Sequence, residues 1–253
     1  MPLTETGVAV VTGGATGIGA ALARRLADRG LVCVLLGRRK EPLRDLAGEI
    51  GAEYEVCDVS DRNAVERTAE GIRERHPAVG LLVNNAGIPG RVGFLDATPE
   101  TIEELVRVNY LGSVWCLRAF LPALEAAAPA QVVNLVSVAG TVALGPYSAS
   151  KHAQLAFSRS VAAELRPRGV HVLTVNPGFV ETEGFPQQRL RDRGLGRIVV
   201  GPDYVADQIV RALERNRTEI FVPGWYRAAA WGQSAAPALA TRLAGRRRAR
   251  RAR

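Results

Sequence analysis

A tyrosine and a lysine four positions apart, Tyr147 and Lys151, are the pair in this sequence best suited to acid–base chemistry. On a helix, residues with this spacing share one face, so the two side chains can meet. An ammonium group beside a phenol favours the phenolate and thereby lowers the pKa of the phenol. A tyrosine in that setting can give or take a proton during a reaction. A serine, Ser137, stands upstream of the tyrosine.

A glycine-rich stretch near the N-terminus is the second feature, and it reads Thr12-Gly13-Gly14-Ala15-Thr16-Gly17-Ile18-Gly19. Glycine lets the backbone approach a phosphate closely, and a helix that begins there offers free N–H groups and a partial positive charge. The spacing G-x-x-x-G-x-G differs from the G-x-G-x-x-G of the standard dinucleotide fingerprint. A tight strand-to-helix turn without a ligand is therefore the alternative interpretation.

Short apolar runs alternate with longer helical patterns along the chain, which indicates βαβ units and a parallel sheet. We expect strands at 8–12, 32–36, 54–57, 81–84, 132–137, 170–176 and 219–222. We expect helices near 17–29, 41–50, 61–74, 98–127, 147–166 and 202–214. This order predicts an α/β fold with a doubly wound parallel sheet of seven strands, a Rossmann fold, with its ligand crevice beyond the carboxyl ends of the strands. Residues 1–222 are predicted to form this one domain and residues 223–253 a C-terminal extension with a disordered arginine-rich tail.

The composition is that of an ordinary globular protein: 253 residues, 47% hydrophobic and 23% charged. Six of the 33 basic residues lie in the last eight positions, which leaves 27 basic against 25 acidic residues elsewhere. The net charge of +8 therefore belongs to the tail and predicts no nucleic-acid-binding face. Three cysteines, Cys33, Cys57 and Cys116, lie in apolar stretches, where reduced core thiols and a cytoplasmic location are expected. We expect no signal peptide and no membrane-spanning helix, and we assign no metal ligands.

Seven motifs in order resemble those of the short-chain dehydrogenase/reductase family. They are the glycine turn, Asp58-Val59, Asn84-Asn85-Ala86-Gly87, Asn109, Ser137, Tyr147 with Lys151, and Asn176-Pro177-Gly178 leading to Thr182. Each motif is weak alone, but the ordered set is highly specific. The resemblance implies a nicotinamide cofactor, a small-molecule carbonyl or alcohol substrate, and a homodimer or homotetramer.

The resemblance also implies four catalytic residues: Asn109, Ser137, Tyr147 and Lys151. Tyr147 would exchange a proton with the substrate oxygen, which Ser137 would hold in place. Lys151 would lower the pKa of Tyr147 and bond the nicotinamide ribose. Asn109 would hold a water that links Lys151 to solvent; alternatively, it satisfies buried backbone groups at a helix distortion.

The residues that the resemblance places around the cofactor are Thr12, Gly13, Ala15, Thr16, Gly17, Ile18, Gly19, Arg38, Asp58, Val59, Asn85, Ala86, Gly87, Tyr147, Lys151, Pro177, Gly178, Val180 and Thr182. Asp58 could instead cap the following helix, although Ser60 and Asp61 are better placed to do so. One departure concerns the spacing of the catalytic pair. In this family the serine usually stands further upstream of the tyrosine, so the loop 138–146 is short and could open the pocket or displace Ser137 from Tyr147.

The choice of cofactor depends on the residues after the second strand, Gly37-Arg38-Arg39-Lys40. An acidic residue there would bind the ribose hydroxyls and select NAD, and none is present. Arg38 is placed to grip a 2′-phosphate through two parallel hydrogen bonds. We predict NADP(H), with NAD(H) as the alternative, and we expect Arg39 and Lys40 to be solvated turn residues.

The segment 181–200 is expected to form a lid over the substrate, and its apolar residues, with Phe179 before it, favour an apolar small molecule. Aromatic residues followed by the arginine run could make a peripheral membrane contact, but an extension packed on the body or on a partner subunit is favoured. The sequence therefore predicts an NADP(H)-dependent oxidoreductase acting on a carbonyl or secondary alcohol. The rival hypothesis is a non-catalytic NADP(H)-binding redox sensor or scaffold.

Overall fold

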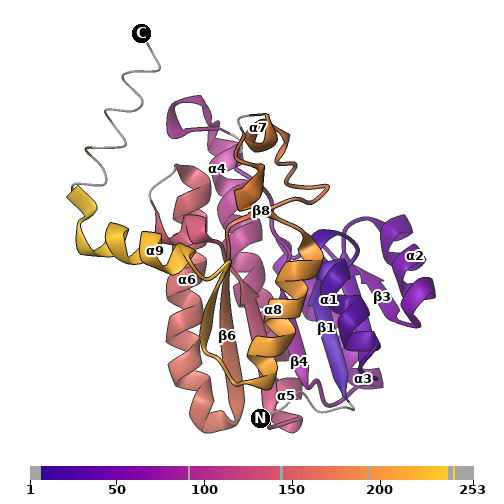
Figure 1. Ribbon diagram of the computed structural model, residues 1–253. Helices are drawn as coiled ribbons and strands as arrows, with labels where there is room; N and C mark the ends of the chain where they lie inside the picture. The colour runs from indigo at the N-terminus through magenta and orange to yellow at the C-terminus, as the bar shows by residue number, and fades with distance from the viewer. Residues whose placement is uncertain (1–6, 91, 143–144, 193, 239–241, 243–253) are drawn as a thin grey trace.

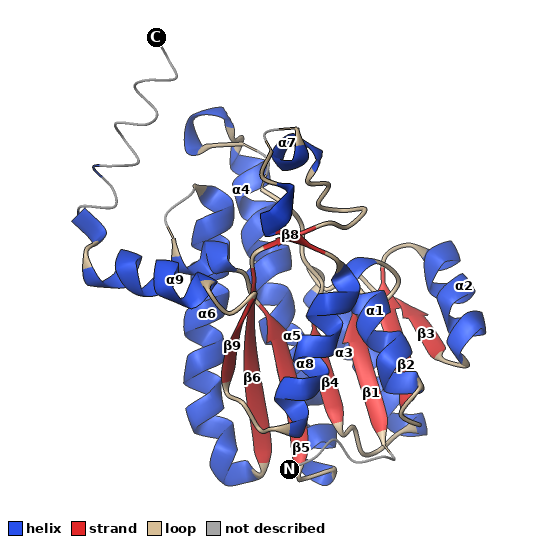
Figure 2. Cartoon of the chain, viewed as in Figure 1, coloured by secondary structure: helices blue, strands red, loops and turns tan. Residues whose placement is uncertain are grey.

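A seven-stranded parallel sheet with helices on both faces forms the centre of the molecule (Figures 1 and 2). The computed structural model describes residues 7–90, 92–142, 145–192, 194–238 and 242. The strands run in the order β3-β2-β1-β4-β5-β6-β9 across the sheet. Their bounds are β1 Val8–Thr12, β2 Val32–Gly37, β3 Glu53–Val56, β4 Leu81–Asn84, β5 Ala130–Leu135, β6 Val170–Pro177 and β9 Glu219–Val222. The predicted doubly wound α/β fold is thus confirmed.

Two hydrophobic cores cover the two faces of the sheet, because successive residues of a strand point to opposite sides. Ala9 and Val11 of β1 belong to one core, and Val10 belongs to the other. The first core is closed by helices α1 (Gly17–Ala27), α2 (Lys40–Ile50) and α8 (Pro202–Glu214). The second is closed by α3 (Arg62–Arg75), α5 (Gly112–Ala126) and α6 (Pro146–Leu165). Both faces are apolar, so the strands read as continuous hydrophobic runs.

The fourth predicted helix, 98–127, is not one regular helix. It consists of α4 (Pro99–Val106), a π-helical turn at Arg107–Leu111, and α5. A π-helical turn inserts an extra residue into the ladder of hydrogen bonds, and such turns often lie at functional sites. Here the turn carries Asn109, whose side chain is fully buried.

The lid segment and the C-terminal region add small elements beyond the main sheet. Strands β7 (Phe179–Val180) and β8 (Val199–Val200) pair in parallel, and the short helix α7 (Gln188–Arg191) lies between them in sequence. In Figure 1, β8 and α7 lie above the carboxyl ends of the central strands. Helix α9 (Tyr226–Ala235) follows β9 and packs beside the 3₁₀ turn Val138–Thr141. The arginine run and the predicted disordered tail at 243–253 lie outside the described residues.

The position of the ligand crevice follows from the strand order. The chain places β2 and β3 on one side of β1 and then crosses to β4 on the other side. Such a reversal opens a crevice beyond the carboxyl ends of the strands. The turns after β1, β2, β4 and β5 therefore converge at one edge of the sheet, and these turns carry most of the predicted site residues.

The three cysteine thiols are buried and unpaired, as predicted. Burial raises the pKa of the Cys33 thiol to about 11 and raises that of Cys116 as well. Among the described helices, none combines the length and the apolar character that crossing a membrane requires.

Candidate active site

Tyr147 and Ser137 meet at the carboxyl end of β5 despite the short loop between them. Ser137 follows the strand closely, and Tyr147 lies in the first turn of α6, after Gly145 with a φ of 102° and Pro146. Within the loop, residues 138–141 form a 3₁₀ turn, and residues 143–144 lie outside the described residues. Burial raises the pKa of Tyr147 to about 12, and a hydrogen bond with Ser137 acts in the opposite direction. Ser137 thus lies close enough to Tyr147 to act on its pKa, although the loop between them is short.

Lys151 lies one helical turn beyond Tyr147, and its ammonium group is buried. Its Nζ donates to Leu135 O at 3.0 Å and to Gln154 Oε1 at 2.8 Å. Burial lowers the pKa of Lys151 to about 7. The causes that act on the pKa of Tyr147 are burial and the hydrogen bond with Ser137, and the expectation that Lys151 lowers this pKa stays a prediction. The phenol has lost solvent, while the hydrogen bonds of the ammonium group go to β5 and to its own helix.

Asn109 holds the chain after β4 in place beside Lys151. Its Oδ1 accepts from Ile88 N at 2.8 Å, and its Nδ2 donates to Ile88 O and to Ser150 Oγ, both at 3.1 Å. These contacts agree with the alternative interpretation of Asn109. In that interpretation its side chain satisfies backbone groups at a helix distortion. A Cβ on Gly87 would lie 3.1 Å from Asn109 Oδ1 and 3.6 Å from Lys151 Nζ. The exposed Gly87 thus lies beside both groups.

The glycine turn is shaped to receive an anion. Gly13 and Gly17 have φ angles of 60° and 56°, and a Cβ on Gly19 would lie 2.3 Å from Gly13 O. Thr16 precedes α1 in an extended conformation and makes no side-chain cap, and the first turn of α1 holds no acidic residue. The first N–H groups of the helix therefore face the crevice without a competing carboxylate, which fits the pyrophosphate of a dinucleotide. The neighbouring Ala15 and Ile18 pack against the core beneath the turn.

Side chains from β1 and β4 fix the shape of this turn. Thr12 Oγ1 donates to Val83 O at 3.1 Å and accepts from Asn85 N and Ala86 N, both at 3.0 Å. Asn85 Nδ2 in turn donates to Thr12 O and Gly13 O, both at 2.9 Å. Thr12 Oγ1 and Asn85 Nδ2 thus bond the protein backbone and shape the cradle.

The residues after β3 form the adenosine side of the crevice. Asp58 Oδ1 accepts from Ser60 N at 2.9 Å, while Asp61 caps α3 by accepting from Asn63 N and Ala64 N. The preference for Asp61 over Asp58 as the helix cap is thus confirmed. Val59 is buried, and its Cγ2 would lie 2.8 Å from a Cβ on Gly112. Val59 therefore packs α5 against this edge of the site.

The two arginines after β2 have different surroundings. Arg38 is exposed beyond the end of β2. Arg39 forms a two-pronged ion pair with Glu183, with Nη1 to Oε1 at 2.8 Å and Nη2 to Oε2 at 3.2 Å. Arg39 is more than half exposed, as expected of a solvated turn residue, and in addition an acidic residue of the lid reaches it across 144 positions of sequence.

The residues after β6 form the opposite wall of the crevice. Pro177 and Val180 are buried, and Gly178 N donates to Val222 O at 2.9 Å. A Cβ on Gly178 would lie 2.0 Å from Cε2 of Tyr226, so the first residue of α9 packs directly on this turn. Thr182 lies against the glycine turn, with its Cγ2 3.1 Å from the place of a Cβ on Gly17.

Two further contacts enclose Tyr147. The ring of Phe185, in the lid, lies 6.3 Å from the ring of Tyr147 between centroids. On another side, a Cβ on Gly90 would lie 2.2 Å from Tyr147 Cβ, so only glycine allows the chain after β4 to pass so close. The tyrosine is thus held between the lid and the backbone at residue 90.

Sequence reasoning missed four residues of this site: Gln154, Glu183, Gly90 and Tyr226. A signal existed for Gln154, which stands three positions after Lys151 on the same helix face. Glu183 directly follows Thr182, but nothing local indicates that its partner is Arg39. Gly90 and Tyr226 have no local signal, because each acts through a contact with a distant element.

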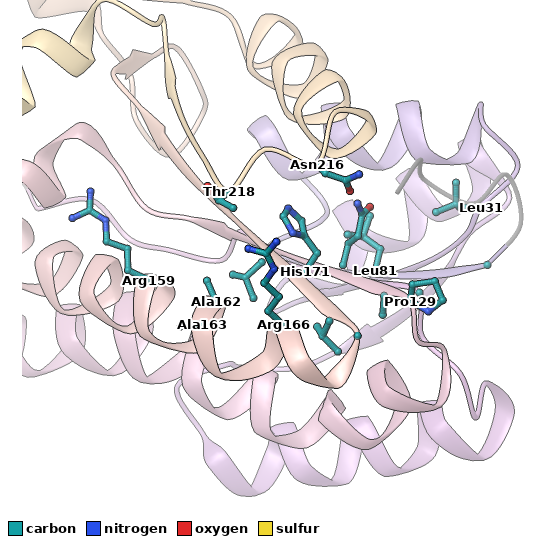
Figure 3. Close-up of a pocket in the computed structure, with 17 residues that line it drawn as sticks. Leu31, Leu81, Pro129, Arg159, Ala162, Ala163, Arg166, His171, Asn216 and Thr218 are labelled. Carbon is teal, nitrogen blue, oxygen red and sulfur yellow. The ribbon is translucent and has the colours of Figure 1, made fainter.

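Two other hollows of the surface lie away from Tyr147. One of about 670 Å³ opens beside the amino ends of the strands, where Leu31, Leu81, Pro129 and His171 line it (Figure 3). The other, of about 600 Å³, lies between α6, β9 and α9. The first hollow is at the end of the sheet opposite to the crevice, so it takes no part in the site described above.

Comparison with known proteins places this geometry in a family. The family model described as short chain dehydrogenase matches residues 7–192. Dehydrogenase/reductase SDR family member 7B of Xenopus laevis is 31% identical over 242 residues, which cover 87% of this chain and 75% of that protein.

Two solved structures of dehydrogenases also match this chain. A short chain dehydrogenase/reductase from Burkholderia phymatum, in complex with NAD, has a TM-score of 0.83 at 29% identity and covers 94% of this chain and 96% of its own. An alcohol dehydrogenase from Thermococcus sibiricus, complexed with 5-hydroxy-NADP, has a TM-score of 0.77 at 28% identity and covers 85% of this chain and 95% of its own. With a Rossmann sheet, a glycine cradle and a Tyr–Lys helix already in place, this chain belongs to the short-chain dehydrogenase/reductase family of NAD(P)-dependent oxidoreductases.

Proposed function

We propose that this protein interconverts a carbonyl group and a secondary alcohol on an apolar small molecule, with NADP(H) as the hydride carrier and Tyr147 as the acid–base group. The observation that carries the proposal is the placement of Ser137 just beyond β5 and of Tyr147 in the first turn of α6, one helical turn from a buried Lys151. A phenol, a hydroxyl and an ammonium group at the carboxyl end of β5 suit proton exchange with a substrate oxygen.

The chain's own groups divide the work of carbonyl reduction as follows. The nicotinamide, when bound, supplies the hydride that adds to the carbonyl carbon. Tyr147 gives its phenolic proton to the carbonyl oxygen, and the Ser137 hydroxyl donates a hydrogen bond that positions that oxygen. Lys151, beside Gly87, would hold the nicotinamide ribose, and the tyrosine would regain its proton from solvent along the side held by Asn109. In the oxidative direction each of these transfers runs in reverse.

The apolar nature of the substrate is supported by side chains around the mouth of the site. Phe179 and Leu195 are exposed on the lid side, and Phe94 and Leu95 are exposed on the loop before α4. A Cβ on Gly145 would lie 3.9 Å from Phe94 N, which places this loop beside the start of α6. Exposed apolar groups gathered around a cleft commonly mark a ligand-binding surface.

Substitution of Tyr147 by phenylalanine tests the reaction. Tyr147→Phe removes the proton donor and keeps the ring against Phe185, so we expect kcat to fall by about 10²- to 10⁴-fold with the affinity for NADPH unchanged. The measurement is NADPH oxidation with a panel of apolar ketones and aldehydes, beside NADPH titration by fluorescence. Turnover that survives the substitution would remove Tyr147 from the mechanism.

NADP(H) preference is proposed because Arg38 and Arg39 stand where the adenosine ribose is expected and none of residues 37–40 is acidic. Arg38→Ala should weaken NADPH binding by about tenfold or more and leave NADH binding within about twofold, because only NADPH carries the 2′-phosphate. Dissociation constants for both nucleotides decide this. An equal loss for both would make Arg38 a bystander.

The rival hypothesis, a non-catalytic NADP(H)-binding redox sensor or scaffold, drew its support from the short loop between Ser137 and Tyr147. The hydrogen bond of Ser137 that acts on the pKa of Tyr147 weighs against this hypothesis. The same ketone panel separates the two hypotheses, because a sensor would bind NADPH and turn over no substrate.

A further inference from the structure

An ion pair between Glu183 and Arg39 joins the lid to the turn after β2. Its two prongs measure 2.8 and 3.2 Å, and both side chains are more than half exposed. Glu183 directly follows Thr182, which lies against Gly17 of the glycine turn. The lid therefore touches the crevice at two successive residues, once over the glycine turn and once at the turn after β2.

These two places are where a bound dinucleotide has its own negative groups. In a Rossmann fold the pyrophosphate lies at the helix that follows the glycine turn, and the adenosine ribose lies beyond the second strand. The Glu183 carboxylate holds Arg39 by two parallel hydrogen bonds, which is also how a guanidinium group grips a phosphate. In the described structure, Glu183 thus makes the contact that a ribose 2′-phosphate would make with Arg39.

From this geometry we propose that Glu183 is a specificity-determining residue, whose carboxylate competes with the 2′-phosphate of NADP(H) for Arg39 and so sets the ratio of NADPH to NADH affinity. The proposal rests on the proposed use of this cleft by NADP(H). An exposed ion pair is screened by solvent and is readily exchanged, so a phosphate of higher charge can displace the carboxylate. NADH carries hydroxyl groups at that position and does not need Arg39.

The test is the ratio of the dissociation constant of NADH to that of NADPH, measured by fluorescence titration for the wild type and for Glu183→Gln. The substitution removes the competing charge, and we expect the ratio to rise by about three- to tenfold through tighter NADPH binding, with NADH changed by less than about twofold. A ratio that stays constant or falls would overturn the proposal. So would equal tightening of both nucleotides, because Glu183 would then act on lid opening alone.

A matched control is present in helices α1 and α2. Arg24 and Glu49 form another exposed two-pronged pair, at 2.6 and 2.7 Å, between α1 and α2. Glu49→Gln removes the same kind of charge and should leave the ratio unchanged. In an Arg39→Gln background, Glu183→Gln should have no further effect on NADPH binding, and a full effect in that background would contradict competition for Arg39.

The same titrations test the proposed NADP(H) preference separately from the role of Glu183. A wild type that binds NADH as tightly as NADPH would refute the NADP(H) preference. The role of Glu183 is judged instead by how the ratio of the two dissociation constants changes between the wild type and Glu183→Gln. The titrations need no turnover, so they do not depend on finding the substrate.

Discussion

At the scale of single residues, Lys151 has the environment furthest from that of an ordinary lysine. Its ammonium group is buried between Leu135 O and Gln154 Oε1, and burial lowers its pKa to about 7 from an ordinary value of 10.5. The folded protein therefore loses this proton near neutral pH, while the unfolded chain keeps it up to about pH 10. Between these values the unfolded state binds more protons, so the free energy of unfolding must rise with pH.

Lys151→Met should remove this dependence on pH. The stability of the wild type relative to the variant should increase as the pH is raised from about 7 to about 10, by up to about 1.4 kcal/mol per pH unit. The raised pKa of Tyr147 lowers the free energy of unfolding only above pH 10, the ordinary pKa of tyrosine. It therefore does not affect the range from about pH 7 to about pH 10. Urea unfolding at several pH values measures the difference. Lys40→Met, at the exposed start of α2, is the control, and parallel curves for Lys151→Met and the wild type would contradict the prediction.

At the scale of elements, α9 supports the wall of the crevice. Tyr226 is buried on the Gly178 turn, while Trp225 and Trp231 of the same region are exposed. The ring of Trp225 stacks on Tyr226 with 3.7 Å between centroids, and Arg227 lies over the ring of Trp231. The C-terminal region thus contacts the site through the ring of Tyr226. No motif near Gly178 indicates this contact.

The close contact between α9 and the crevice wall predicts a coupled pair of substitutions. Gly178→Ala would push a methyl group into the Tyr226 ring, and we expect a loss of about 1–3 kcal/mol in the free energy of unfolding together with a lower kcat/KM. In a Tyr226→Ala background the methyl group finds room, so the same substitution should cost much less. A double-mutant cycle on unfolding and on turnover measures the coupling. Strictly additive losses would show that the two residues do not depend on each other.

At the scale of the whole molecule, one sheet joins the two hydrophobic cores. Phe120 of α5 is fully buried in one core, and Leu22 of α1 is fully buried in the other. Ion pairs between Arg25 of α1 and Asp203 and Asp207 of α8 link segments far apart in sequence. Because every central strand contributes side chains to both cores, neither core can be lost while the other remains.

Phe120→Ala and Leu22→Ala should therefore weaken the same unfolding transition. We expect each to lower the free energy of unfolding by about 3–5 kcal/mol, from lost burial and the cavity left behind. Urea unfolding followed by far-ultraviolet circular dichroism and by tryptophan fluorescence provides two probes of the transition. Separate transitions for the two probes, in either variant, would show that the cores unfold independently.

The sequence by itself determined the order of strands and helices, the parallel sheet, and the places of Tyr147, Lys151 and the glycine turn at its carboxyl edge. These follow from hydrophobic periodicity and from motifs within a few residues of each other, which are local properties of a chain. Only the tertiary structure decided that Ser137 meets Tyr147 across a short loop and that the Lys151 ammonium group bonds Leu135 and Gln154. It also decided that Glu183 holds Arg39 and that Tyr226 packs on Gly178. Apart from Lys151 and Gln154, which are three positions apart on one helix, these contacts join residues ten to more than a hundred positions apart, and they depend on how packed elements lie in space.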